Sequence, residues 1–456
     1  MRKIAITGLG VVSPLGNDVA GFWDAVKAGR SGAGPVTRFD ASRLEARVAC
    51  EVKGFDPSLY MDKKEARKMA LFSQYAVAAA VQAWRDGGLP ERSSGPERSS
   101  GPERSAAGEA QPEPAAAPGS ADPLAAAPEA ARVGPYSAHR VGTVIGNGIG
   151  GIDVCLESHK KLLESGPGRM LPMTVPLMIA NEAAGNVAMR LGIGGPALTA
   201  VTACASGTDA IGQALDLLRA GRCDAILAGG TEAAITEFAM GGFCRLQALS
   251  TAWNDQPLRA SRPFDKDRDG FVIGEGAAVL LLEDYDSAKA RGARIYAELA
   301  GYGASCDAYH LTAPDPSAEG GARAIRAALE DAGLRPDEVD YYNAHGTSTA
   351  MNDPIETLMV KKAFGAHAHK LKVSSTKSMT GHCIAAAGAI EALICVKAVE
   401  EGFAPPTINL EHPDLEAGCD LDYVPNHGVS TPIRAAASSS LGFGGHNAVL
   451  VVKRPS

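Results

Sequence analysis

Short apolar stretches alternate with amphipathic stretches along most of the chain, and this alternation constrains the fold more than any other feature. Residues 4–7 and 225–228 are apolar runs typical of buried strands. Residues 208–218 repeat apolar side chains with helical spacing, and another helix is predicted over 63–84. The second half continues in the same manner, with a predicted helix over 322–332 and a predicted strand over 339–344. The alternation predicts an α/β architecture.

Residues 90–135 depart from this pattern. The unit Pro-Glu-Arg-Ser-Ser-Gly begins at Pro90 and again at Pro96, and an Ala/Pro-rich stretch follows to about residue 131. Such a composition buries too little apolar surface to form a core. We expect a surface insertion within one α/β unit, because the predicted strand over 141–145 continues the unit that precedes it. A linker between two independent domains is the alternative.

Charge and cysteine spacing exclude several classes of protein. The formal net charge is −8, whereas general nucleic-acid binders are basic. The nine cysteines contain no C-x-x-C pair, which argues against a zinc or redox motif and fits a reducing cytoplasm. The apolar N-terminus is interrupted by Gly8 and Gly10, and no run reaches the roughly 18 apolar residues of a membrane span. We expect a cytoplasmic protein without nucleic-acid or membrane partners.

Cys204 is the strongest candidate nucleophile. It lies in Val-Thr-Ala-Cys-Ala-Ser-Gly-Thr-Asp, between a predicted strand over 198–202 and the predicted helix over 208–218. The small neighbours are those that a sharp strand-to-helix turn requires. A thiol at a helix N-terminus also faces the positive end of the helix dipole, which favours the thiolate. A buried structural cysteine at a tight turn is the alternative.

Two histidines follow further strand-like segments. His345 lies in Asn-Ala-His-Gly-Thr-Ser-Thr, at the end of a predicted strand, where α/β sheets commonly carry catalytic groups. His382 lies in Ser-Ser-Thr-Lys-Ser-Met-Thr-Gly-His, before a helix predicted over 384–400. The same segment carries Lys377, which would be costly to bury unpaired. Glu356 would neutralise Lys377 if the two loops converge.

Two glycine-rich turns admit different interpretations. The turn at 441–447, Leu-Gly-Phe-Gly-Gly-His-Asn, lies between apolar strands and is able to direct backbone N–H groups at an oxyanion. The turn at 146–151 matches the dinucleotide motif G-x-G-x-x-G. No strand with an acidic ribose partner follows about twenty residues later, so we do not expect nucleotide binding. His367 and His369 are read as surface residues and not as metal ligands.

Taken together and in this order, the motifs resemble the condensing enzymes of the thiolase superfamily. The likeness is strongest to the type II β-ketoacyl-[acyl carrier protein] synthases of bacterial fatty-acid synthesis. It rests on Thr-Ala-Cys-Ala-Ser-Gly, Ala-His-Gly-Thr-Ser-Thr, the segment ending in Thr-Gly-His, Gly-Phe-Gly-Gly, and the charged motif at 262–272. The resemblance implies a homodimeric acyltransferase with a five-layered α-β-α-β-α sandwich. Its two duplicated halves would span 1–280, with the nucleophile, and 281–456, with the histidines.

The resemblance also implies a mechanism. Cys204 would attack an acyl thioester carried by the phosphopantetheine arm of acyl carrier protein, and the N–H groups of Cys204 and Phe443 would form the oxyanion hole. Malonyl-[acyl carrier protein] would then lose carbon dioxide, and the resulting carbanion would attack the acyl-enzyme. His345 and His382 would stabilise the enolate. Lys377, held by Glu356, would order the histidine loops, and no metal or other cofactor is implied.

The remaining positions concern substrate and partner binding. By resemblance, Thr347 and Thr349 would bind the pantetheine amides, Ile149 would line the acyl pocket, and Phe443 would act as its gate. A basic run is expected to dock the acidic carrier protein, formed by Lys63, Lys64, Arg67 and Lys68. Leu441 and His446 stand where phenylalanine and threonine are common in the family, so the resemblance leaves the chain-length preference open.

Three alternatives share the fold. A ketosynthase of type II polyketide synthesis has the same motifs. A thiolase would need a second catalytic cysteine and lacks the paired-histidine signature. A chain-length-factor-type partner subunit would be non-catalytic and lacks the nucleophile, whereas Cys204 is present here with both histidines.

Overall fold

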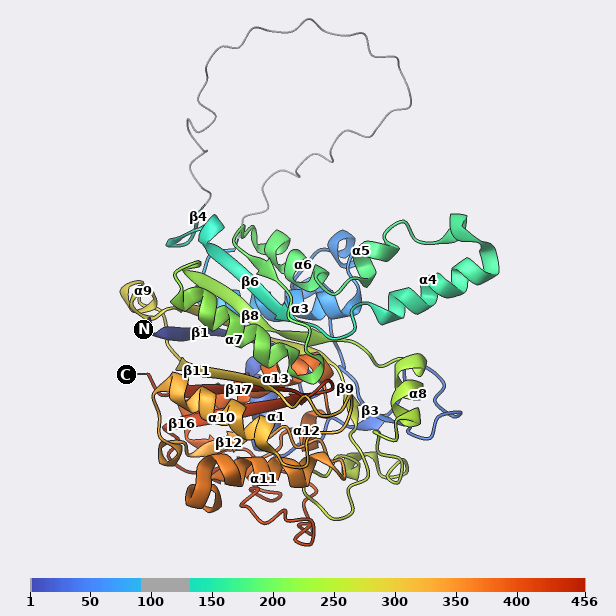
Figure 1. The fold of residues 1–456 in the computed structure, drawn as a ribbon. Coiled ribbons are helices and arrows are strands. Elements are labelled where there is room, and N and C mark those ends of the chain that lie inside the picture. The colour runs from blue at the N-terminus through green and yellow to red at the C-terminus, as the bar shows by residue number, and fades with distance from the viewer. Residues whose placement is uncertain (1, 92–131, 456) are drawn as a thin grey trace, which may run out of the picture.

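The computed structural model describes residues 2–91 and 132–455, so most of the insertion expected over 90–135 lies outside the described residues. Ten strands form one large mixed sheet (Figure 1). The first half of the chain supplies the order β7-β6-β8-β10-β1, and the second half supplies β11-β17-β16-β12-β13. The first five are β1 (Ile4–Val12), β6 (Val141–Gly146), β7 (Ala197–Leu198), β8 (Ala225–Glu232) and β10 (Gly276–Asp284). The second five are β11 (Ala297–Cys306), β12 (Tyr341–Asn343), β13 (Lys372–Ser374), β16 (Ala435–Gly442) and β17 (His446–Lys453).

The two half-sheets are related by a repeated strand order. They join where β1 pairs antiparallel with β11, through Ile4↔Leu299 and its neighbours. Counted outward from this junction, each half has two antiparallel partners followed by shorter parallel strands. The boundary expected at residue 280 falls inside β10, and the strand pairing divides the chain between β10 and β11.

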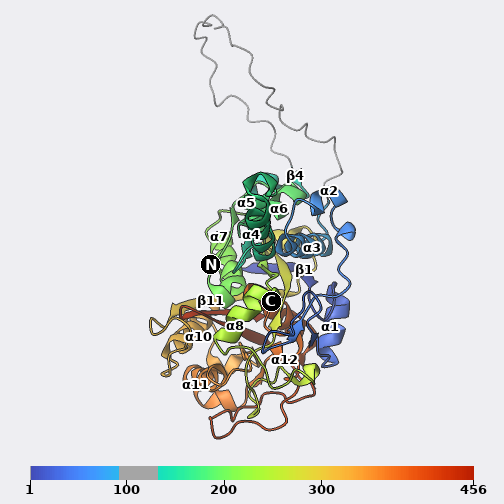
Figure 2. The ribbon, with the colours of Figure 1, turned by 90° about the vertical axis from the view of Figure 1, so that its right-hand side faces the viewer.

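Helices fill the space between the half-sheets and cover both outer faces (Figures 1 and 2), which confirms the five-layered prediction. The central layer pairs two helices, and each contacts strands of both halves. The outer layers pack on one half-sheet each. The central helices are α7 (Ser206–Arg219) and α13 (Ala387–Glu401); α3 (Leu71–Asp86) and α6 (Glu182–Leu191) cover the first half-sheet, and α10 (Glu319–Ala332) and α11 (Asn352–Phe364) cover the second.

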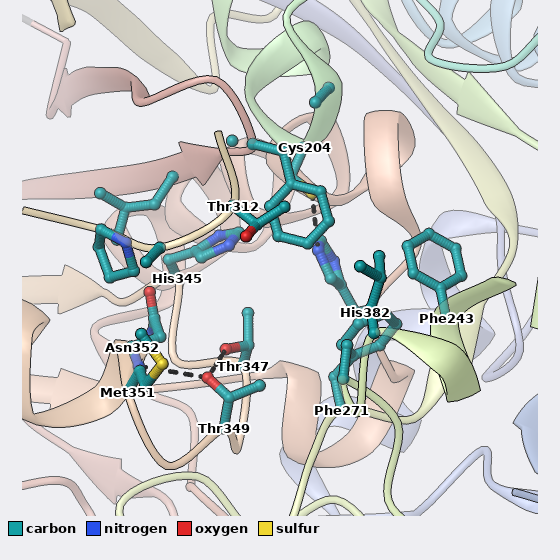
Figure 3. Close-up of a pocket in the computed structure, with 18 of the residues that line it drawn as sticks. Cys204, Phe243, Phe271, Thr312, His345, Thr347, Thr349, Met351, Asn352 and His382 are labelled. Carbon is teal, nitrogen blue, oxygen red and sulfur yellow. Dashed lines mark hydrogen bonds between the residues drawn. The ribbon is translucent and has the colours of Figure 1, made fainter. Parts of the chain in front are cut away.

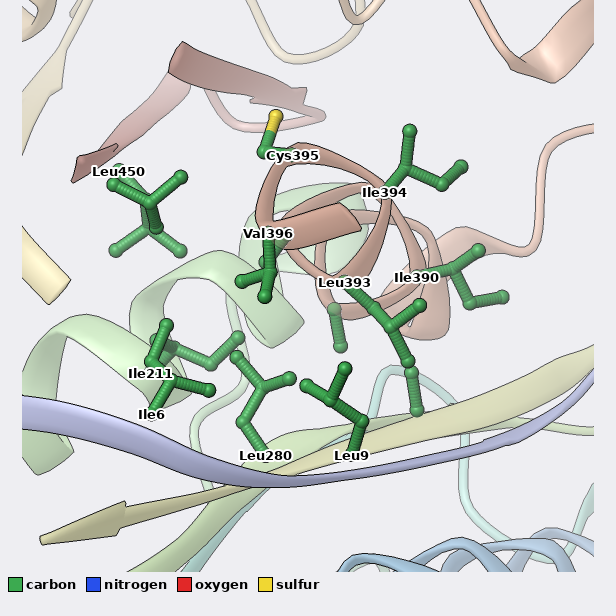
Figure 4. Close-up of a cluster of buried hydrophobic side chains, with 14 of the residues drawn as sticks. Ile6, Leu9, Ile211, Leu280, Ile390, Leu393, Ile394, Cys395, Val396 and Leu450 are labelled. Carbon is green, nitrogen blue, oxygen red and sulfur yellow. The ribbon is translucent and has the colours of Figure 1, made fainter. Parts of the chain in front are cut away.

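The largest apolar core surrounds the central helices (Figure 4). Ile6 and Leu280 project from the sheet toward Ile211 of α7 and Leu393 of α13, and all four side chains are fully buried. Helix α13 is apolar on nearly every face because both half-sheets and α7 surround it. Each such side chain stabilises the fold by about 1.5–3 kcal/mol when fully buried.

The central helices approach each other at glycines. A Cβ atom on Gly207 would lie 2.6 Å from the carbonyl oxygen of Ala385, and one on Gly388 would lie 2.0 Å from Oγ1 of Thr208. Larger residues would therefore separate α7 from α13 at their N-terminal turns. These turns carry Cys204 and the segment that follows His382.

Smaller elements complete the molecule, and two of them differ from the sequence prediction. The helix expected over 63–84 is divided, because Ala70 is extended and serves as the N-cap of α3. The strand expected over 198–202 ends at Leu198. No helix in the described part of the chain is long and apolar enough to cross a membrane. The additional helices are α1 (Val19–Lys27), α2 (Lys63–Ala66), α4 (Ile152–Ser165), α5 (Thr174–Met178), α8 (Glu237–Arg245), α9 (Tyr285–Ala290) and α12 (Lys377–Thr380). The small sheets contain β2 (Gly34–Pro35), β3 (Val48–Cys50) and β9 (Ile273–Gly274); β4 (Arg132–Val133) and β5 (Tyr136–Ser137); and β14 (Phe403–Ala404) and β15 (Val429–Ser430).

Candidate active site

Cys204 lies in a tight turn immediately before α7. Ala203 has a φ of 52°, in the left-handed region, and the turn Ala203–Ala205 leads directly into the helix. Ser206 fixes this bend, because its hydroxyl accepts from the N–H of Thr202 at 2.9 Å and donates to the carbonyl of Ala203 at 2.7 Å. The small residues of the motif are therefore needed for the turn, and the turn presents the thiol at the start of a buried helix.

His382 contacts the sulfur directly. Its Nε2 atom lies 3.0 Å from Sγ of Cys204 (Figure 3). The backbone of His382 is held by the segment around β9: its N–H donates to the carbonyl of Val272 at 2.7 Å, and the N–H of Gly274 donates to its carbonyl at 2.9 Å. The ring of Phe271 packs edge-on against the imidazole, with centroids 5.2 Å apart. Backbone and ring are thus both fixed before any substrate binds.

His345 faces the same space from the end of β12. Its ring centroid lies 5.2 Å from that of His382, and the two rings are nearly perpendicular at 89°. The Glu356 carboxylate accepts from the N–H groups of His345 at 2.7 Å and Gly346 at 2.6 Å, and from the hydroxyl of Ser439 at 2.7 Å. Glu356 therefore orders the His345 loop through its backbone.

The predicted pairing of Lys377 with Glu356 is wrong. The Lys377 ammonium instead forms an ion pair with Glu391, on the second turn of α13, and the two side chains are only 1% and 2% exposed. Because Glu356 is already occupied by N–H and hydroxyl donors, the ammonium finds its counter-charge on the other side. Glu391 was missed by the sequence analysis. Its signal was a lone acidic residue in an otherwise apolar buried helix, where an unpaired charge is too costly.

The histidine rings are held neutral. Burial lowers the pKa of His382 well below its ordinary value, and the nearby Lys377 charge lowers it further. Burial lowers the pKa of His345 in the same way, with smaller contributions from Lys377 and His382. A neutral imidazole carries both an N–H donor and a bare nitrogen acceptor. The site thus holds two rings that are each able to donate or accept one hydrogen bond.

The thiol is also neutral at rest. Burial raises the pKa of Cys204 to about 12, and this outweighs the lowering by Lys377 and by the N–H groups of Phe443 and Cys204. Burial of the sulfur thus opposes the thiolate form that the helix N-terminus is expected to favour. Attack by the sulfur requires that its proton be taken, and His382 is the base within reach.

A cavity of about 650 Å³ opens at the thiol and collects most of the predicted binding residues. Thr347 and Thr349 lie on one wall with their hydroxyls 3.0 Å apart (Figure 3). Three further lining residues had no predicted role: Phe243 of α8, Phe271 of the motif at 262–272, and Thr312. The other predicted residues that line the cavity are Ile149, Phe443, Leu441 and His446.

The predicted docking residues lie apart from the cavity lining. Lys63, Lys64, Arg67 and Lys68 are all exposed on and just after α2. The short helix is closed at its start by a reciprocal pair, in which Asp62 accepts from the N–H of Glu65 and Glu65 accepts from that of Asp62. The cap fixes the helix while leaving the basic side chains in solvent. Among the described residues, no group of three or more histidine, cysteine or acidic side chains is arranged to hold a metal ion.

Family models match most of the chain. The N-terminal domain of β-ketoacyl synthase matches residues 1–102 and 124–288, and the C-terminal domain matches residues 296–411. The chain belongs to the β-ketoacyl synthase family. The unmatched segment 103–123 falls within the atypical stretch of the sequence.

Named relatives narrow the comparison within this family. The chain is 47% identical to 3-oxoacyl-[acyl-carrier-protein] synthase 2 of Coxiella burnetii and 46% identical to that of Synechocystis, over 99% of this chain and at least 98% of each relative. Among solved structures, a β-ketoacyl synthase from Burkholderia phymatum has a TM-score of 0.84 at 33% identity, with full coverage of both chains. A type II polyketide synthase carrier protein in complex with its ketosynthase matches with a TM-score of 0.82 at 32% identity, again with full coverage.

Proposed function

We infer that this chain is a β-ketoacyl-[acyl carrier protein] synthase II, an acyltransferase that extends carrier-bound acyl chains in fatty-acid elongation. The observation that carries the inference is the 3.0 Å contact between Nε2 of His382 and Sγ of Cys204, beside a second neutral histidine and at the base of a cavity. The full-length relatives at 46–47% identity support the same activity by name.

The first stage transfers the acyl group to the enzyme. Sγ of Cys204 attacks the acyl thioester of the carrier protein while its proton passes to His382. The N–H groups of Cys204 and Phe443, which already act on the sulfur in the free site, stabilise the oxyanion of the tetrahedral intermediate. Collapse of the intermediate forms the Cys204 thioester, and the departing pantetheine thiol takes the proton.

The second stage forms the carbon–carbon bond. Malonyl-[acyl carrier protein] loses carbon dioxide, and the electron pair of the broken bond remains as an enolate. The rings of His345 and His382 donate hydrogen bonds to the enolate oxygen, His382 as the neutral tautomer that carries its proton on Nε2. The enolate carbon attacks the acyl thioester and expels Cys204 as the thiolate, giving the β-ketoacyl product. Because decarboxylation drives the step, the proposed reaction needs no metal or other cofactor.

Binding roles follow from position. Thr347 and Thr349 offer paired hydroxyls to the pantetheine amides along the cavity wall. Ile149 and Phe443 border the acyl pocket and its entrance. The carrier protein docks on the basic side chains of and after α2, which match an acidic partner in charge.

We also propose a homodimer, whose interface covers the free edge of the large sheet at β7. This short edge strand is exposed, and further exposed apolar side chains lie just after it, on α4, and in the segment that leads into α5. Unpaired sheet edges and exposed apolar groups are both costly to leave in water. The side chains concerned are Leu163, Leu171, Met173, Val175, Leu198 and Val201. Sedimentation of the intact protein measures the state: a dimer is expected, and a monomer would contradict it.

Mass spectrometry tests the activity. The purified protein is incubated with medium-chain acyl-[acyl carrier protein], and Cys204→Ala serves as the control. We expect an acyl adduct on Cys204 of the wild type only, and its conversion to β-ketoacyl product when malonyl-[acyl carrier protein] is added. Failure of the folded wild type to form an adduct with any chain length would contradict the proposal.

A ketosynthase of polyketide synthesis is the second candidate, because one structural match, at 32% identity, is a type II polyketide ketosynthase with its carrier protein. The higher identity of the fatty-acid relatives, 46–47%, places it second. Product analysis separates the two. A fatty-acid enzyme accepts saturated acyl chains and stops after one extension, whereas a polyketide enzyme extends its own unreduced product repeatedly.

A further inference from the structure

Glu232 is a buried acid that the proposed mechanism does not use. It ends strand β8, and its side chain is fully buried behind the cavity wall. The N–H of Gly148 donates to its Oε2 at 3.0 Å, and Nδ2 of Asn147 donates to its Oε1 at 3.3 Å. The N–H groups of Ile149 and Ala385 are directed at the same carboxylate.

Like Glu356, Glu232 is held by backbone N–H groups, and this distinguishes both from two other buried acids near the site. Glu391 is paired with Lys377, and Glu275 with Arg38. Among the residues that the structure describes, Glu232 has no ion-pair partner, and its stabilising contacts are the N–H groups of uncharged residues. Burial raises the pKa of Glu232 to about 7, so the N–H donors offset the cost of burying its carboxylate only in part.

The donors belong to two different walls of the active site. Gly148 and Ile149 form the turn that borders the acyl pocket. Ala385 lies three residues after His382, in the turn Ile384–Ala386 that begins helix α13. The Glu232 carboxylate thus links the Gly148–Ile149 turn, which borders the acyl pocket, to the loop that carries His382. The contact between Gly148 and Glu232 is close, because a Cβ atom on Gly148 would lie 2.7 Å from Oε2 of Glu232.

The link that Glu232 makes between these two turns is important for a condensation reaction. The acyl chain lies against the wall at Ile149 while its thioester carbon must reach the groups held by His382. A displacement of about 1 Å between such elements lowers rates by up to about a hundredfold. Because a carboxylate has about four acceptor sites and a glutamine oxygen only two, an amide in this place leaves backbone N–H groups unsatisfied.

We propose that Glu232 is a positioning residue that sets acyl-chain specificity by fixing the Gly148–Ile149 wall relative to the His382 loop. The proposal rests on the proposed function, since it assigns a role within that reaction. Glu232 acts through backbone groups and does not line the cavity.

The first test compares Glu232→Gln with Glu283→Gln. Glu283 is a matched control, because it is fully buried in neighbouring strand β10 but is held by Tyr136 and Arg291, which do not line the cavity. Acylation of Cys204 is measured with carrier-bound chains of increasing length. For Glu232→Gln we expect the ratio of kcat/KM for long over short chains to rise at least fivefold, because the loosened wall yields to longer chains. The control keeps the wild-type ratio. A uniform loss across all lengths, equal to that of the control, would show a purely structural role and overturn the proposal.

The second test needs no substrate. Hydrogen exchange is followed in the peptides that contain Gly148–Ile149 and Ala385. Faster exchange in both peptides is expected for Glu232→Gln, and wild-type exchange for the control; unchanged exchange at both turns would refute the proposal. If Glu232→Gln does not fold, Glu232→Asp takes its place, since it keeps the carboxylate but withdraws it by one methylene. If the wild type forms no acyl adduct, the proposed function fails, whereas the exchange result still decides whether Glu232 holds the two walls.

Discussion

Removing the Glu391 carboxylate is predicted to destabilise the protein strongly, because it leaves the buried Lys377 ammonium without a counter-charge. The side chains of Lys377 and Glu391 are 1% and 2% exposed, so water cannot replace the lost carboxylate in Glu391→Gln. Breaking a buried ion pair on one side costs about 3–5 kcal/mol, a large part of the total stability of an ordinary domain. As a matched control, Lys27→Met removes a partly exposed pair with Glu401, which is worth at most about 1 kcal/mol.

The reverse substitution is expected to cost less. In Lys377→Met the remaining acid becomes neutral by binding a proton, since burial already raises the pKa of Glu391 to about 7. A folded-state pKa above that of the unfolded chain means that the folded state binds more protons. Stability of this variant therefore falls as the pH rises above about 5 and continues to fall through the folded pKa. Three other titratable groups face the same region: Glu356 and the rings of His345 and His382. Their contribution is determined by measuring the stability of the wild type over the same pH range.

Denaturation in urea, followed by circular dichroism at pH 7, measures the free energy of unfolding of the wild type, the single variants and the double variant. The double variant Lys377→Met/Glu391→Leu removes both charges, and it is expected to recover most of the stability lost in Glu391→Gln. Its condensation rate is expected to stay low, because the Lys377 charge near the histidines is gone. If Glu391→Gln costs under 1 kcal/mol, or the double variant is as unstable as the sum of the single changes, the buried-pair argument is refuted.

Three further outcomes are expected. Alkylation of Cys204 by iodoacetamide should accelerate with pH well beyond pH 8, because burial raises its pKa to about 12; a plateau below pH 8 would contradict this. Lys63→Glu combined with Arg67→Glu should raise KM for carrier-bound substrate but not for a small acyl thioester, and equal changes in both would exclude docking there. Gly207→Ala should cost about 1–3 kcal/mol in urea denaturation, since its Cβ would lie 2.6 Å from the oxygen of Ala385; wild-type stability would refute the close approach.

The positions of the reacting groups were predictable from the sequence. Cys204, His345 and His382 each follow a strand-like segment, and the structure brings all three to one cavity. This succeeded because strand ends and tight turns leave local signals: small residues, glycines and a change from one periodicity to another. The five-layered arrangement came from resemblance, since alternation alone specifies only an α/β fold.

The pairing of buried charges was not predictable. Lys377 was assigned to Glu356, but the structure pairs it with Glu391 and gives Glu356 to backbone donors. Which acid an ammonium meets depends on the direction in which helices cross, and sequence spacing does not contain that direction. The protonation of Cys204 also depends on burial, which the whole fold determines, whereas the helix dipole that the sequence indicates is local.

The duplicated architecture explains why one site needs both halves of the chain. The turn before α7 and the turn before α13 have the same unusual backbone, with a φ of 52° at Ala203 and 47° at Ile384. Their helices meet at glycines, so the two turns are forced against each other at the centre of the molecule. The first turn presents the thiol of Cys204, and the second follows His382 and supplies the Ala385 N–H directed at Glu232. Each half alone would thus offer either a nucleophile without a base or a base without a nucleophile, and the chemistry exists only where the central helices touch.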